Sequence, residues 1–310
     1  MARRAAPDQA GSVIALHSSS VLHADVKMKQ VIAGLLVVAG FLWLYWPVMA
    51  KLVGAWATDD NYSHGFFIVP LAAYFAWERR RRFLAAPSRP SAFGLLVVIG
   101  SILLLAAGVI GAEMFITRIS ILGTVVGIVL FLFGWNRLRV LLFPLAFLLL
   151  MIPLPAILFN QIAFPLQLLA SQEGELAITA ANVPVLREGN LLVLPNTTLE
   201  VAEACSGIRS LVSLLTLGIV FGYFADSRPW VRTLIALSTI PVAILSNGMR
   251  VAGTGIAAHR FGPAAAEGFF HEFSGWLLFV VAFLMLLGLQ RLLLRAVPPP
   301  RQAIAMAGAQ

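Results

Sequence analysis

The stretch from Phe93 to Ala112 reads FGLLVVIGSILLLAAGVIGA, and none of its twenty residues is charged. A helix of about 20 mostly apolar residues is long enough to cross the hydrocarbon core of a membrane. The rest of the chain has the same character, because 60% of its 310 residues are hydrophobic and only 12% are charged. Soluble domains contain about 25% charged residues. The sequence therefore predicts an all-α integral membrane protein.

Eight apolar segments of this kind predict a bundle of about eight transmembrane helices. The segments are Val31–Ala50, Phe66–Trp77, Phe93–Ala112, Ile119–Trp135, Val140–Phe159, Ile208–Ala225, Val231–Val251 and Phe273–Leu294. The segment Gln161–Ala181 is amphipathic and contains a proline, so we expect it to lie on the membrane surface. The flanking regions divide the chain into a disordered cytoplasmic tail at 1–30, a polytopic membrane domain at 31–296 and a second cytoplasmic tail at 297–310.

Clusters of arginine indicate how the bundle is oriented. They lie at Arg79–Arg82, at Arg137 and Arg139, at Arg228 and Arg232, and at Arg291, Arg295 and Arg301. All of them fall on one side of the membrane if both termini are cytoplasmic, as the positive-inside rule requires. The formal net charge of +8 then favours contact with anionic lipid headgroups over nucleic-acid binding.

The longest predicted loop, Asn160–Ala204, faces outward in this topology. Within it Leu191–Leu194 and Thr198–Val201 alternate in hydrophobicity around Pro195-Asn196, which predicts a short hairpin before the sixth span. The preceding residues, Arg187–Asn190, are typical of a turn.

Cys205 is the only cysteine of the chain, which excludes an intramolecular disulfide and a thiolate metal cluster. The five histidines show no ligand spacing, so we expect neither a metal nor another cofactor. Cys205 precedes the sixth predicted span, Arg250 ends the seventh and His271 begins the eighth. The topology thus brings all three to the outer face, where ionisable residues at membrane depth tend to be functional.

These three residue types are suited to acyl transfer. A thiol becomes a strong nucleophile when a helix N-terminus or a cation lowers its pKa, and Cys205 stands at the predicted start of a helix. His271 can carry a proton near neutral pH. Arg250 stays protonated, so its expected role is to stabilise an oxyanion or to bind the substrate carbonyl.

Four more residues are candidates for supporting roles. Arg209 is either a partner of the thiolate or an ion on the helix surface, and Glu203 either orients Arg209 or His271 or is an ordinary loop carboxylate. Asn247 shares a helix face with Arg250 and could position it. His64 either contacts substrate or hydrogen-bonds loop backbone. His259 is the second candidate for the base.

Several strings resemble the exosortase and archaeosortase family. They are LEVAEACSGIRSL at Leu199–Leu211, NGMRV at Asn247–Val251, the later His271 and YSHGF at Tyr62–Phe66. The resemblance covers the chain from about Tyr62 to Trp276, and Cys205, Arg250 and His271 match the three invariant positions of the family.

The resemblance implies a membrane cysteine protease or transpeptidase in the cell inner membrane, with its active site at the periplasmic face. Such enzymes are thought to cleave C-terminal sorting signals of exported proteins through a thioester on the cysteine. The expected substrates carry a Pro-containing motif, a membrane helix and a basic tail, and the envelope acceptor is unknown. Two alternatives are a polytopic transporter, for which charged residues at span centres are missing, and a non-catalytic subunit of an exopolysaccharide export system.

Overall fold

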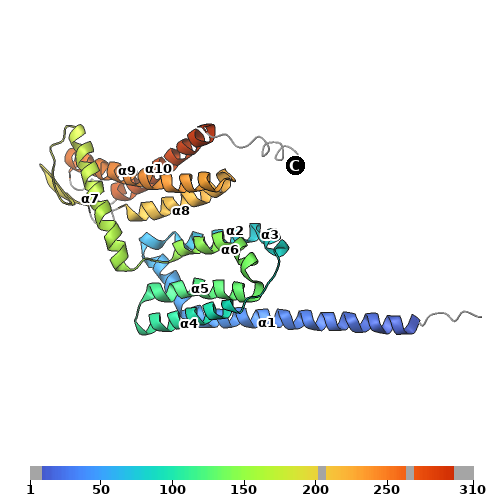
Figure 1. Ribbon diagram of the computed structural model, residues 1–310. Helices are drawn as coiled ribbons and strands as arrows, with labels where there is room; N and C mark the ends of the chain where they lie inside the picture. Colours follow the sequence, from blue (N-terminus) through green and yellow to red (C-terminus); the bar gives the residue numbers. More distant parts are fainter. Residues whose placement is uncertain (1–8, 202–206, 263–268, 297–310) are drawn as a thin grey trace, which may run out of the picture. The chain divides into compact units, whose positions relative to one another are not determined.

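The computed structural model describes residues 9–201, 207–262 and 269–296, which are mostly helical (Figure 1). The helices are α1 (Gln9–Thr58), η1 (Asp60–Tyr62), α2 (Gly65–Glu78), α3 (Arg80–Ala85), α4 (Phe93–Ile110), α5 (Met114–Phe133), α6 (Trp135–Phe147), η2 (Leu148–Met151), α7 (Ala156–Ala180), α8 (Ile208–Ala225), α9 (Pro229–Phe261) and α10 (Phe269–Ala296). The strands are β1 (Leu186–Glu188), β2 (Leu191–Leu194) and β3 (Thr197–Glu200).

The chain has two compact units, residues 1–53 and 54–310. The first contains α1 up to Val53, and the last turn of α1, residues 54–58, belongs to the second unit; α1 begins at Gln9 and is therefore longer than the predicted first span. All the remaining elements belong to the second unit, where α4 packs on α5, α2 on α6, and α9 on α7, α8 and α10.

Helices α4 and α5 form a hairpin whose backbones approach closely at small residues. A Cβ atom on Gly94 would lie 2.2 Å from the backbone nitrogen of Phe131. At the other end a Cβ on Gly108 would lie 2.8 Å from the Cγ2 of Thr117. Such contacts replace the hydrophobic effect as the source of helix association within lipid. Two of the predicted spans are thus confirmed as packed helices.

The predicted fifth span, Val140–Phe159, is wrong as a single helix. The chain runs through α6 and the 3₁₀ turn η2 and then bends by 80° into α7. Pro153 and Pro155 lie in the bend, and proline cannot donate the backbone hydrogen bond that a continuing helix needs. Backbone carbonyls that have no helical hydrogen bond at the bend have side-chain partners instead. The Nε1 of Trp56 donates to the Met151 oxygen at 2.9 Å. The Nε2 of His64 lies 3.1 Å from the Leu150 oxygen.

Helix α7 continues without interruption past Pro165 and packs along α9. Glycines form this contact, because a Cβ on Gly174 would lie 2.7 Å from the Cγ1 of Val251. One on Gly255 would lie 2.6 Å from the Cδ1 of Ile178. Pro165, which suggested an interrupted segment, is therefore accommodated within a continuous helix. The place of the segment Gln161–Ala181 on the membrane surface stays a prediction.

The predicted hairpin is confirmed, and a third strand extends it. Strand β2 pairs antiparallel with β3 across the two-residue turn Pro195-Asn196 and with β1 across Gly189-Asn190. The turn predicted at Arg187–Asn190 is present but shorter, because its first two residues belong to β1. Gly189 has φ +66°, the left-handed conformation that such a tight turn needs.

The sheet is packed against α7 and α9. Its buried side chains share one apolar core with these helices, formed by Ala170, Ile178, Val183, Leu192, Leu194, Val201, Val251 and Ala252. The Nδ2 of Asn196, in the β2–β3 turn, donates to the backbone oxygens of Ala258 at 3.4 Å and His259 at 3.2 Å. The sheet is thereby held against the C-terminal end of α9.

Polar contacts join the end of α2 to the end of α8, and an ion pair lies in the connection that follows α8. The hydroxyl of Tyr223 donates to Glu78 at 2.6 Å and lies 3.4 Å from the Nε of Arg79. In the connection, Arg228 pairs with Asp226 at 2.6 Å and holds the pKa of the Asp226 carboxyl below its usual value. Arg79 thus has a packing role beside its predicted role in setting topology.

Five helices in the described residues are long and apolar enough to cross a membrane, and the bent α6–α7 pair could add a sixth. Helix α2, at 14 residues, and the apolar part of α10, Phe279–Leu293, are shorter. The predicted class, a helical multi-pass membrane protein, is confirmed. The number of eight spans stays a prediction.

Candidate active site

The start of α8 is seated on α9 at Asn247. Gly207, which precedes α8, has φ +77°, and a Cβ on it would lie 2.7 Å from the Cγ of Asn247. Asn247 is buried, with 5% of its surface exposed. Arg250 follows it by three residues on the same helix and is half-buried. Since Gly207 comes two residues after Cys205 in the sequence, two of the predicted site segments meet here.

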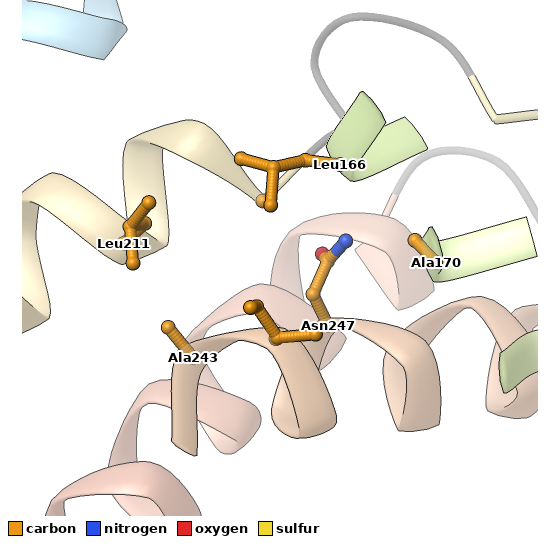
Figure 2. A pocket seen from close by; sticks show the side chains of 7 residues that line it. Leu166, Ala170, Leu211, Ala243 and Asn247 are labelled. Atoms are coloured by element: carbon orange, nitrogen blue, oxygen red, sulfur yellow. The ribbon is translucent and has the colours of Figure 1, made fainter. Parts of the chain in front are cut away.

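Two narrow pockets flank Asn247. The first lies between α7, α8 and α9 and is lined by Leu166, Ala170, Gly207, Leu211, Ala243, Ile244 and Asn247 (Figure 2). In Figure 2 the amide of Asn247 points from α9 toward α7. The second lies between α8, α9 and α10 and is lined by Ser210, Leu214, Ser246, Asn247, Arg250, Phe279 and Ala282. The residues around Asn247 are therefore apolar on one side and mixed on the other.

The predicted triad is only partly described. Cys205 and Glu203 lie outside the described residues. His271 falls in the first turn of α10, and its side chain also lies outside the described part. Helix α10, which carries His271, packs on both α8 and α9. The meeting of Cys205, Arg250 and His271 stays a prediction.

Arg209 has a partner in the η1 turn. Its Nη1 lies 3.3 Å from the Oδ2 of Asp60, and its Nε lies 3.5 Å from the Oδ1 of Asn61. The side chains of Arg209 and Asp60 are 43% and 79% exposed, so this pair adds little stability. Of the two roles considered for Arg209, the geometry favours an ion on the helix surface that ties α8 to η1.

His64 belongs to the bend between α6 and α7. Its Nε2 is placed to donate to the Leu150 carbonyl, which leaves Nδ1 as the unprotonated nitrogen of a neutral ring. Nδ1 is buried without a hydrogen-bond partner in the described part of the chain. Burial lowers the pKa of His64, opposed by the hydrogen bond to Leu150. The geometry thus favours the structural role over substrate contact.

His259 lies well away from Arg250. Nine residues separate them on α9, and the rise of an α-helix makes this about 13 Å. The backbone oxygen of His259 accepts the hydrogen bond from Asn196, so this residue lies with the β2–β3 turn. That position weakens the case for His259 as the base.

Glu173 is a residue at this site that the sequence did not reveal. It lies on α7, half-buried, and its Oε2 would be 2.1 Å from a Cβ on Gly248, the residue after Asn247. Nothing in the amphipathic pattern of α7 distinguishes it from other polar residues. The only signal was the glycine between Asn247 and Arg250, which leaves room for a side chain from another helix. Among the described residues, no three histidine, cysteine or acidic side chains gather where a metal could bind.

Comparison with known families gives one result that covers most of the chain. The family described as transmembrane exosortase matches residues 56–288, a range that contains Cys205, Asn247, Arg250 and His271. No curated protein and no solved structure matches the chain. The match extends from the last turn of α1 into α10 and covers three quarters of the sequence. The chain therefore belongs to the transmembrane exosortase family.

Proposed function

We propose that this chain is a membrane cysteine protease or transpeptidase that cleaves C-terminal sorting signals of exported proteins through a thioester on Cys205. The observation that carries the proposal is the seating of Gly207 on Asn247. Gly207 follows Cys205 by two residues, and this contact places it within one helical turn of Arg250. The helix that carries His271 packs on the same two elements.

The proposed roles follow from residue chemistry. The Cys205 thiolate, beside the N-terminal end of α8, attacks the carbonyl carbon of the scissile peptide bond. Arg250 donates hydrogen bonds to the oxygen that becomes negative. As the C–N bond breaks, His271 gives the leaving amine a proton. Water or an acceptor nucleophile then attacks the thioester carbonyl, the C–S bond breaks, and the proton of the nucleophile returns through His271 to restore the free thiol.

The substrate assignment comes from the family. Exported proteins that end in a Pro-containing motif, an apolar helix and a basic tail would reach the site from the membrane, and an envelope component would accept the cleaved protein. We propose the inner membrane as the location, with Cys205, Arg250 and His271 at the periplasmic face.

Replacement of Cys205 by alanine tests the proposal. We expect Cys205→Ala to insert in normal amounts and to lose all processing of a co-expressed substrate with such a C-terminus. His271→Ala should lose about 10²–10⁴-fold in rate. His259→Ala, on the far part of α9, serves as the matched control and should process normally. Full processing by a well-expressed Cys205→Ala protein would refute the proposed enzymatic function.

A further inference from the structure

A buried serine hydroxyl and Arg250 line the same pocket between α8, α9 and α10. We propose that this pocket holds one water molecule, bound by Ser246 and Ser210, and that the water positions the guanidinium of Arg250 for catalysis. Ser246 and Ser210 are then positioning residues. This inference rests on the proposed function, because it concerns the group to which that function assigns the oxyanion.

The hydroxyl of Ser246 is the polar group that calls for a partner. Ser246 is buried, with 7% of its surface exposed, and its Oγ has no hydrogen-bond partner in the described ranges. Two hydroxyls earlier on α9 donate to their own helix, Ser238 to the Ile235 oxygen at 2.7 Å and Thr239 to the Ala236 oxygen at 2.6 Å. A buried hydroxyl without a partner opposes folding, so a small polar molecule beside Ser246 would remove this cost.

The residues that line the pocket bring two hydroxyls to the guanidinium. Ser246 and Arg250 are one turn apart on α9, and side chains four residues apart on a helix are neighbours. Side chains of a helix lean toward its N-terminal end, which directs Arg250 toward Ser246. Ser210 lines the same pocket from the first turn of α8. The amide of Asn247 points instead toward α7 (Figure 2).

The size of the pocket suits a single water. The volume open to the centre of a water molecule is about 10 Å³, close to the roughly 10–15 Å³ that one water needs. This is too small for a side chain of a substrate. The apolar part of the lining consists of Leu214, Phe279 and Ala282. A buried water also needs two to four polar partners, which Ser210, Ser246 and Arg250 supply.

The hydrogen-bonding capacities of these groups are complementary. A guanidinium only donates and has five N–H groups, whereas a hydroxyl both donates and accepts. The water can therefore accept from Arg250 and from the hydroxyl of Ser246, and donate to the Oγ of Ser210. The other N–H groups of Arg250 remain able to bind an oxyanion.

A fixed guanidinium matters for the proposed reaction. Stabilisation of a developing charge depends on donors that are in place before the reaction begins, and arginine has a long side chain with many rotamers. Ser210 follows Cys205 by five residues. The water thus ties Arg250 to the first turn of the helix that follows the nucleophile.

The test uses the full chain in lipid nanodiscs and a peptide copied from a co-encoded protein with a Pro-containing motif, apolar helix and basic tail. We expect Ser246→Ala to lower kcat about 10-fold, roughly the worth of one hydrogen bond, and to leave KM unchanged. Ser246→Val fills the pocket and should lower kcat at least as far. Thr216→Val is the matched control, because the Oγ1 of Thr216 is also buried without a partner in the described chain but lines neither pocket. It should retain wild-type kcat.

Substitution of Ser210 tests the shared water from the other helix. Ser210 is half-buried, so Ser210→Ala is expected to fold even if changes at position 246 disturb the packing. It should lower kcat by a similar factor of about 10. The double variant Ser210→Ala/Ser246→Ala should lose about as much as either single variant, because the same water is lost in each case.

Four outcomes would overturn the inference: wild-type kcat in Ser246→Ala and Ser210→Ala, a loss confined to KM, additive losses in the double variant, or the same loss in Thr216→Val. Failure of the proposed function is separate, because it appears as processing by Cys205→Ala.

Discussion

At the scale of single residues, Gly207 decides how the N-terminal end of α8 meets α9. Its positive φ is unfavourable for residues with a side chain, and the position of a Cβ is already occupied by the Asn247 amide. Both the backbone and the space therefore require glycine. The residue that follows Cys205 and Ser206 is in this way part of the contact that brings α8 to Asn247.

Substitution of this glycine should be costly. We expect Gly207→Ala to lower the free energy of unfolding by about 1–3 kcal/mol, because strained backbone conformations cost this much, and to reduce processing as Asn247 is displaced. Gly253→Ala is the matched control, because nothing lies within 4 Å of a Cβ at that helical position. It should be neutral or stabilising. Thermal unfolding in detergent measures both, and equal stabilities for the two variants would contradict the role of Gly207.

At the scale of elements, the bend between α6 and α7 is the feature that departs most from a simple bundle. Irregular backbone at membrane depth is tolerated only where protein groups satisfy its polar atoms. Trp56 and His64 meet that need from the end of α1 and the start of α2. The YSHGF string at Tyr62–Phe66 thus has a structural reason for its histidine.

The histidine makes the stability of the bend dependent on pH. Because burial lowers the pKa of His64 in the folded state, the unfolded chain takes up its proton first as the pH falls. The contribution of neutral His64 to the free energy of unfolding is fully present above the unfolded pKa of about 6.5. It is lost as the pH falls through the lower pKa of the folded state. We expect Tm to decrease between about pH 7 and 5 in wild type, and less in His64→Gln, which keeps an N–H donor without titrating there.

Trp56→Phe supplies the control for this measurement. It leaves the Met151 carbonyl without its donor and should cost about 1–3 kcal/mol. Because an indole does not titrate in this range, the loss should be the same at each pH. An unchanged pH slope in His64→Gln would show that other groups produce the dependence.

At the scale of the whole molecule, the side on which the β-sheet lies depends on how many elements cross the membrane before it. Five predicted spans precede the sheet and place it outside. Helix α2, with 14 residues, is about 21 Å long, less than the hydrocarbon core of about 30 Å. The bent α6–α7 pair counts as one crossing or none. If either failed to cross, the sheet and the proposed site would lie on the cytoplasmic side.

Labelling of single cysteines decides this topology. We expect Asn196→Cys, in a Cys205→Ala background, to react with an impermeant thiol reagent in cells whose inner membrane is intact. Ser88→Cys should react only after lysis. Both residues are exposed in the structure, so access to the reagent depends on the side of the membrane alone. Labelling of Ser88→Cys from outside would invert the proposed orientation.

Hydropathy predicted the paired helices α4 and α5 correctly, because their signal is local and extends over a whole span. It failed at Val140–Phe159, where apolar residues continue through Pro153 and Pro155 while the backbone turns. Strand β1 was missed because Arg187 and Glu188, charged and next to a glycine, are typical of a turn.

The candidate site shows the same division between local and distant signals. Asn247 and Arg250 stand out within one short string. Glu173 could not be found in this way, because its neighbour Gly248 is 75 residues further along the chain. Only the packing of α7 on α9 brings the two together.

The contact between Glu173 and Gly248 also limits the order in which related sequences can change. An alanine at 248 would overlap both the carboxyl group and the Cβ of Glu173, so it becomes tolerable only after position 173 has become glycine. The reverse order passes through an intermediate with displaced helices. The two positions are therefore expected to change together, with position 173 changing first.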